Sequence, residues 1–303
     1  MRLRALRRLR AGLLLGGVLL VPSLAAGQPA PQGSPPRRVF EYWFGPTLVF
    51  PGFDGTVTSD FPATLDYGES TGRATQRLTL RAPRHLGVEG GIGIFPTKHA
   101  GIQIRLNYVT RDLSGTSSPF AVTLDYTAMQ PPDYVPRQYH TDSTRSWPAP
   151  TSTATQLTLS VDGAVRWDVG ARLSGTVSGG LSFMRTKGSA ESLAYTRYWM
   201  GGHSVLFSST YAASFDYGPV TAIGFDIGGD IGVNIAGPLD VLMDVRYVRA
   251  GAITPDVRLT GFVEPTEFAG DVSVATVEAR MAPIRASFNA SFARIFFGVR
   301  VRP

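Results

Sequence analysis

Residues 220–236 read VTAIGFDIGGDIGVNIA, and apolar side chains recur at every second position through most of this stretch. The apolar set is Ile223, Phe225, Ile227, Ile231, Val233 and Ile235, and glycine, Asp226, Asp230 and Asn234 lie between them. Successive side chains of a β-strand point to opposite faces. The pattern therefore predicts a strand with one apolar face and one face that carries two carboxylates.

The first residues indicate export of the chain. MRLRALRRLR carries five arginines, the apolar run AGLLLGGVLLV follows, and Ala25, Ala26 and Gly27 form a small-residue cleavage pattern. These are the three parts of a secretory signal peptide, so residues 1–27 are predicted to be removed after Gly27, with Ala26 as the second choice. Residues 28–38, QPAPQGSPPRR, have the composition of a linker, which we place in the periplasm.

The charge and cysteine content exclude several function classes. The formal net charge is +6, but five of the positive charges are arginines of residues 1–10, so the remainder carries about +1. This balance does not favour a nucleic-acid partner. The chain has no cysteine, which excludes disulfides, thiolate metal sites and a lipid-anchored cysteine.

The same alternation recurs throughout residues 39–303, without a convincing amphipathic helix. We expect eight strands, at 39–50, 84–95, 101–109, 156–169, 171–183, 220–236, 240–248 and 292–302. Short connections alternate with four long ones, roughly 51–83, 110–155, 184–219 and 249–283. All long loops then emerge at one end, and both termini of the folded part emerge at the other. This layout is typical of a closed, antiparallel, up-and-down transmembrane β-barrel of the bacterial outer membrane.

The face opposite the apolar one carries charges of both signs in equal number. It consists of Glu41, Glu89, Asp162, Asp226, Asp230 and Asp244, and of Arg105, Arg166, Arg172, Arg246, Arg294 and Arg300. An eight-stranded barrel has an interior that side chains can fill. Because a buried charge is costly unless it is paired, we expect these residues to form a structural network of ion pairs that plugs the lumen. A soluble exported barrel that binds a ligand is the alternative.

The region 39–303 resembles the small outer-membrane barrels of the OmpA and OmpX type in architecture. The final strand, ARIFFGVRV, resembles the C-terminal strand that the assembly machinery of this family reads, although such strands usually end in Phe or Trp and this chain ends in Arg302-Pro303. The resemblance implies insertion by barrel-assembly machinery and a location among outer-membrane lipid and lipopolysaccharide. Ile284, Ala286 and Phe288 have the opposite parity to Ile295, which a β-bulge near 292–294 or a segment beyond the membrane would explain.

The sequence shows little that points to chemistry. The histidines, His85, His99, His140 and His203, have no metal-ligand spacing, and no cofactor motif is evident. Some outer-membrane barrels are hydrolases that remove acyl chains from lipid A with a His–Ser pair. The adjacent pair His203-Ser204 would point to opposite faces of a strand, so we expect no enzyme activity.

The function expected is therefore structural or surface-interaction, carried by long loops rich in aromatic residues. These loops suit binding of an extracellular protein or glycan, or they continue the barrel as β-hairpins. A narrow porin-like channel is the alternative function, and a lipid-modifying enzyme is the third. LAYTRYWM and HSVLFSSTY (193–200 and 203–211) could add two membrane strands, which would give ten.

Overall fold

The computed structural model describes residues 40–50, 52, 54–66, 68–170, 172–201, 205–262 and 273–303. The chain divides into two units, Met1–Arg37 and Arg38–Pro303, and all described residues belong to the second. The predicted signal peptide and linker, residues 1–38, lie outside the described residues.

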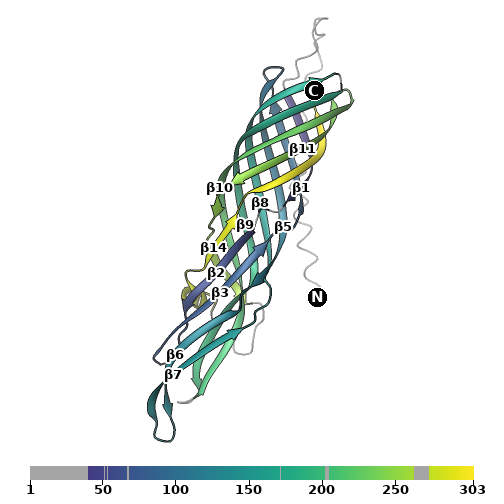
Figure 1. Cartoon of the computed structure of the whole chain (residues 1–303). Coiled ribbons are helices and arrows are strands. Elements are labelled where there is room, and N and C mark those ends of the chain that lie inside the picture. The colour runs from purple at the N-terminus through teal and green to yellow at the C-terminus, as the bar shows by residue number, and fades with distance from the viewer. Residues whose placement is uncertain are drawn as a thin grey trace. The chain divides into compact units, whose positions relative to one another are not determined.

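Eight strands form a ring in which each strand pairs antiparallel with two neighbours (Figure 1). In ring order they are β1 (Phe40–Phe50), β4 (His85–Ile94), β5 (Ala100–Ser117), β8 (Thr151–Val169), β9 (Leu173–Gly201), β10 (Val205–Ala236), β11 (Leu239–Ala250) and β15 (Phe292–Val301). The pairing of β15 with β1 completes the ring. Since ring order equals chain order and each predicted strand supplies one member, the predicted all-β, up-and-down, eight-stranded fold is confirmed.

The ring has two different ends. Three short connections join β4 to β5, β8 to β9 and β10 to β11, and we call this the turn end. Phe40 at the start of β1 pairs with Ile94, and Tyr42 pairs with Val301, so the start of β1 and the end of β15 also lie at the turn end. The long connections from β1 to β4, from β5 to β8 and from β11 to β15, and the prolonged ends of β9 and β10, lie at the opposite end, which we call the loop end (Figure 1).

At the loop end the chain builds more β-structure, which we call the extension. It contains β2 (Asp54–Pro62), β3 (Ser70–Arg81), β6 (Phe120–Gln130), β7 (Val135–Arg145), β12 (Ala252–Ile253), β13 (Val257–Phe262), β14 (Arg285–Asn289), α1 (Val274–Met281) and the distal parts of β5, β8, β9 and β10. The prediction that the loops continue as β-hairpins is confirmed for these described residues. The ten-strand alternative was wrong, because residues 193–201 and 205–211 prolong β9 and β10 and add no strand to the ring.

Strand β5 runs through both regions and shows how they differ. Within the ring its outward side chains are apolar, and its inward side chains Gln103, Arg105 and Asn107 are polar and buried. From Val109 on the two faces exchange character, because Val109 and Leu113 are buried inside, with the buried Arg111 between them, whereas polar residues such as Asp112 alternate with them outside. Thus the ring is apolar outside and polar inside, whereas the extension is mostly polar outside and apolar inside, as in a water-soluble β-protein.

The parity change near the C-terminus has the same cause. Ala286, Phe288 and Phe292 are buried, as are Arg294 and Arg300, so even-numbered positions face inward on both sides of residues 290–291. The pairing of β15 with β11 shows no register shift from Phe292 to Val301. The bulge that the sequence allowed is therefore absent from these strands. Instead the inward residues are apolar up to Phe292, and beyond it the inward side of β15 carries Arg294 and Arg300.

One short helix, α1, lies in the extension, in a stretch whose residues show no convincing helical pattern. Ser273 caps it, and its hydroxyl accepts a hydrogen bond from the Thr276 amide at 3.1 Å. Val277 and Met281, one turn apart, are fully buried in the extension core, and Arg280 Nη1 lies 2.9 Å from Asp66 Oδ1. Eight residues give too short a pattern to stand out from the alternation around it. Among the described residues no helix is long and apolar enough to cross a membrane.

Candidate functional site

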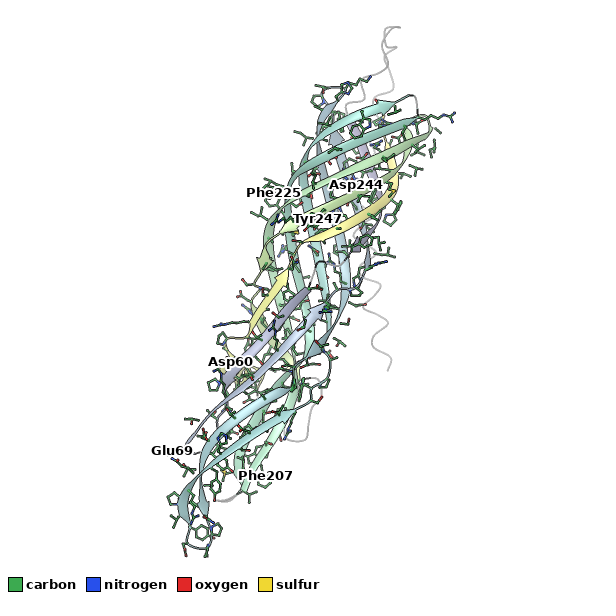
Figure 2. The ribbon with its side chains drawn as sticks, viewed as in Figure 1. Asp60, Glu69, Phe207, Phe225, Asp244 and Tyr247 are labelled. Atoms are coloured by element: carbon green, nitrogen blue, oxygen red, sulfur yellow. The ribbon has the colours of Figure 1, made fainter. Side chains whose placement is uncertain are left out.

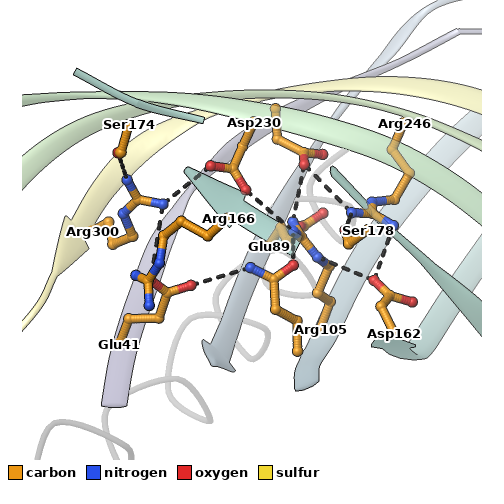
Figure 3. Close-up of polar contacts among 12 residues, drawn as sticks. Glu41, Glu89, Arg105, Asp162, Arg166, Ser174, Ser178, Asp230, Arg246 and Arg300 are labelled. Carbon is orange, nitrogen blue, oxygen red and sulfur yellow. Dashed lines mark hydrogen bonds and ion pairs between the residues drawn. The ribbon is translucent and has the colours of Figure 1, made fainter. Parts of the chain in front are cut away.

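The ring encloses a column of charged side chains, which we call the lumen network (Figure 3). Eleven of the twelve charged residues that the sequence placed in the lumen are buried there: Glu41, Glu89, Arg105, Asp162, Arg166, Asp226, Asp230, Asp244, Arg246, Arg294 and Arg300. Each is at most 5% exposed. They come from all the strands of the ring except β9, whose buried inward polar residues in the ring are serine and threonine.

Arg172 is the exception and corrects the predicted set. It is exposed, and it lies in the turn before β9, which begins at Leu173 and not at residue 171 as expected. Its main-chain oxygen accepts a hydrogen bond from the Asn234 amide at 2.7 Å. A turn residue is outside the two-face alternation of a strand, so its parity says nothing about where its side chain points.

Arg300 contacts several polar groups in the part of the network nearest the turn end. Its Nη1 lies 3.1 Å from Asp230 Oδ1, its Nε donates to Asp240 Oδ2 at 3.0 Å, and its Nη2 donates to Ser174 Oγ at 2.5 Å. Arg302 Nη2 lies 2.7 Å from the same Asp240 carboxylate. Sequence reasoning missed Asp240 and Arg302. Both have the inward parity of Asp244 and Arg300, and this signal could have found them.

Glu41 joins opposite sides of the lumen. One carboxylate oxygen lies 2.7 Å from Arg166 Nη1, and the other accepts a hydrogen bond from Gln103 Nε2 at 3.1 Å. The Arg166 guanidinium also lies 3.7 Å from the centre of the Phe95 ring. These three polar residues come from β1, β8 and β5, and β1 does not pair with β8 or β5. The contacts therefore cross the lumen and fill it.

Arg105 and Arg246 occupy the middle of the network. Arg105 lies 3.4 Å from both Glu89 and Asp162 and 3.2 Å from Asp244. The guanidinium of Arg105 also lies 4.8 Å from the Trp43 ring centre.

Arg246 pairs with Asp226 and lies 2.9 Å from Asp162 Oδ2, and it donates to Ser178 Oγ at 2.5 Å. Each arginine thus serves several carboxylates, which is how a five-donor guanidinium can compensate buried charge.

Glycine makes room for these side chains. A Cβ built at Gly93 would lie only 2.6 Å from Glu41 Cγ, and one at Gly232 would lie 2.9 Å from Ser174 Oγ and collide with the Arg300 guanidinium. Both glycines occupy inward positions of their strands. The alternation of carboxylate and glycine in residues 224–232 therefore has a packing reason, since the lumen has space for large side chains only where neighbours are small.

The outward face of the ring is apolar and exposed. Phe225 is 69% exposed, Ile227 64%, Ile231 59% and Leu86 74%. Figure 2 shows Phe225 and Tyr247 on this outer side, whereas Asp60 and Glu69 belong to the extension. A continuous apolar band around a folded ring is a surface for lipid or another apolar partner.

The extension packs like the core of a soluble protein. Leu124, Phe215 and Phe288 are at most 1% exposed within one apolar cluster. Tyr217 stacks on Phe288 with ring centres 4.8 Å apart, and burial raises the pKa of its hydroxyl to about 12 against the hydrogen bond with Ser152, which lowers it. Side chains therefore close the interior at this level too.

The described histidines do not form a reaction centre. His99 Nδ1 lies 3.1 Å from the main-chain oxygen of Arg166, near the turn end, whereas His140 contacts Asp125 and Asp142 in the β6–β7 hairpin. His85 begins β4. The pair His203-Ser204 lies outside the described residues. No group of three His, Asp or Glu side chains in the described part of the chain could hold a metal ion.

No family model matches the sequence, and no curated protein matches it. Among solved structures, the outer-membrane protein OprG from Pseudomonas aeruginosa is similar over 86% of this chain and 94% of its own, with 10% identity and a TM-score of 0.42. A FadL homologue from the same species is similar over 87% of this chain and 90% of its own, with 8% identity and a TM-score of 0.21.

The β-domain of the Bordetella autotransporter BrkA is similar over 86% of this chain and all of its own, with 7% identity and a TM-score of 0.17. Because these scores and identities are low, the fold assignment rests on the strand pairings and side-chain faces described above.

Proposed function

We propose that the protein is a non-enzymatic, integral β-barrel of the bacterial outer membrane, with a lumen plugged by ion pairs and a structural or surface-interaction role. The observation that carries the proposal is the pairing of an exposed apolar band outside the ring with a buried charge network inside it. Such a ring would be unstable in water, because its apolar side is the exposed one. In hydrocarbon both faces are satisfied, and no strand of the ring leaves an unpaired edge.

The predicted signal peptide supports export to this membrane. The turn end and both ends of the folded part would then face the periplasm, and the extension would project from the cell. Barrel-assembly machinery would insert the chain, and outer-membrane lipid would surround the ring. The extension, with its hairpins, is the part that could meet an extracellular protein or glycan.

A narrow channel is the second candidate, and one observation favours it. Both Oδ atoms of Asp244 and both Nη atoms of Arg294 are buried and make no aligned hydrogen bond with a described residue, although Asp244 lies within ion-pair distance of Arg105. Water in the lumen would satisfy such atoms. A continuous file of water would conduct ions, whereas isolated water molecules would not.

Conductance in a planar bilayer separates the two candidates. The refolded protein should migrate differently on a gel before and after boiling, which shows that the barrel is folded, and should then give no reproducible current steps. A porin of known conductance in the same bilayers is the positive control. Steady steps from the folded protein would overturn the plugged lumen and support the channel.

The non-enzymatic assignment has its own test. Folded protein incubated with phospholipid or lipid A in mixed micelles should release no fatty acid above a boiled control. Release that disappears in His203→Ala would contradict the proposal and support a lipid hydrolase.

A further inference from the structure

Two strands of the ring carry an arginine at the outward position next to the apolar band, and a third exposed arginine lies directly before a strand. On β9 the outward residues Leu181 and Phe183 are followed by Arg185, and on β11 Tyr247 is followed by Arg249. On β4, which runs the other way, Arg84 comes just before the strand and Leu86 is the outermost apolar residue. On β9 and β11 the arginine is the first outward residue beyond the apolar band, and Arg84 is exposed beside the same edge of the band at β4.

The three arginines lie at the same height in the ring. Arg84, Arg185 and Arg249 are ten to twelve residues from the turn-end termini of their strands, at Ile94, Leu173 and Leu239. With about 3.3 Å per residue and a tilt of about 40°, this is about 25–30 Å along the barrel axis. An outer-membrane barrel has an apolar band about 25 Å tall, so these guanidiniums lie at the headgroups of the outer leaflet.

Nothing within the described protein neutralises them. All three are exposed, and none forms an ion pair with another described residue, although the Arg84 guanidinium lies 5.4 Å from the Phe50 ring centre. Lys187 adds a further outward cation two residues beyond Arg185. Asp112 on β5 is the acidic outward side chain at this level. The net charge at this level is therefore positive.

We propose that Arg84, Arg185 and Arg249 form a belt that binds the phosphate groups of a phosphorylated glycolipid in the outer leaflet. The inference rests on the proposed function, because it needs the ring to span the membrane. A guanidinium binds phosphate through two parallel hydrogen bonds, which makes arginine suited to this ligand. The side-chain stems cover the edge of the apolar band while the charged groups reach the headgroup layer.

The test compares lipids that differ only in phosphate. Wild-type protein, refolded in a neutral detergent, is titrated with diphosphoryl lipid A, with chemically dephosphorylated lipid A and with free pyrophosphate, and bound lipid is counted by native mass spectrometry. The test variant is R84Q/R185Q/R249Q. Arg172→Gln is the matched control, because Arg172 is exposed but lies in a turn at the opposite end.

We expect wild type and Arg172→Gln to bind diphosphoryl lipid A at least 10-fold more tightly than the dephosphorylated lipid, and the triple variant to lose this preference. Equal binding of both lipids by wild type, or an unchanged preference in the triple variant, would overturn the belt. Equal retention of free pyrophosphate and lipid would also overturn it, since a headgroup belt needs the lipid anchor.

Failure of the belt and failure of the proposed function give different results. Each variant is first tested for heat-shifted migration and for insertion into phosphatidylcholine vesicles. A protein that inserts but shows no phosphate preference leaves the membrane barrel intact and removes the belt. A wild type that does not insert would contradict the proposed function itself.

Discussion

The ring and the extension share four continuous strands, β5, β8, β9 and β10, yet the two regions pack in opposite ways. In the ring the inward residues of β5 are Gln103, Arg105 and Asn107, and in the extension Leu113 takes the equivalent place. The backbone pairing continues with β8 from Ala100 to Ser114 through this change. The comparison shows that strand geometry alone does not determine which face of a strand is apolar and exposed and which is buried. The side chains determine this, and in the proposed membrane barrel the height at which the apolar and polar faces exchange would mark where the membrane ends.

The largest expected effect comes from emptying the lumen network. Arg246→Leu removes the arginine that pairs with Asp226, so this carboxylate stays buried without its partner, whereas Asp162 keeps Arg105 at 3.4 Å. We expect a loss of about 3–5 kcal/mol in the free energy of unfolding, since an uncompensated buried charge is strongly destabilising. Denaturant titration of the folded protein in lipid vesicles measures it. The conservative outward change Ile227→Leu is the control, and equal stability of the two variants would contradict a network that holds the ring together.

A second change sharpens the comparison on a single strand. Leu106→Arg places a charge on the outward face of β5 near the middle of the apolar band, where Leu106 is 49% exposed. It should cost about 2–4 kcal/mol in a bilayer. Thr116→Arg places the same charge on the outward face of β5 in the extension, and should stay within about 0.5 kcal/mol of wild type. Similar costs at both positions would mean that both regions meet the same solvent.

The smallest effect concerns pH and the β6–β7 hairpin. His140 Nδ1 lies 2.6 Å from Asp125 and Nε2 lies 3.1 Å from Asp142, and these carboxylates raise the pKa of the imidazole above its ordinary value. A raised folded-state pKa stabilises the hairpin below the ordinary value of about 6.5, and this contribution is lost as the pH rises through the folded-state pKa. Hydrogen exchange of the hairpin, corrected for intrinsic rates, should therefore be slower at pH 5.5 than at pH 8.5. In His140→Gln the difference should vanish, while exchange in the ring strands stays unchanged.

The sequence by itself determined the strands of the ring and the face to which each residue belongs. Alternation is a local property, so Asp226 and Ile227 could be assigned to opposite faces without knowing any neighbour. The same rule placed eleven inward charges correctly and failed for Arg172, because a turn breaks the alternation. It also applied to Asp240 and Arg302, which were overlooked at the ends of their strands.

Only the tertiary structure decided which charges meet and where the faces invert. Glu41 pairs with Arg166, and Arg246 pairs with Asp162, across the lumen and between strands that are not neighbours. These contacts depend on the register of the whole ring. The sequence did not reveal that the extension buries its apolar face, because the alternation of apolar and polar residues is the same whichever face is buried. Closing the ring and stacking the hairpins on it fixes which side becomes the interior, and that physical choice is made by the assembled strands together.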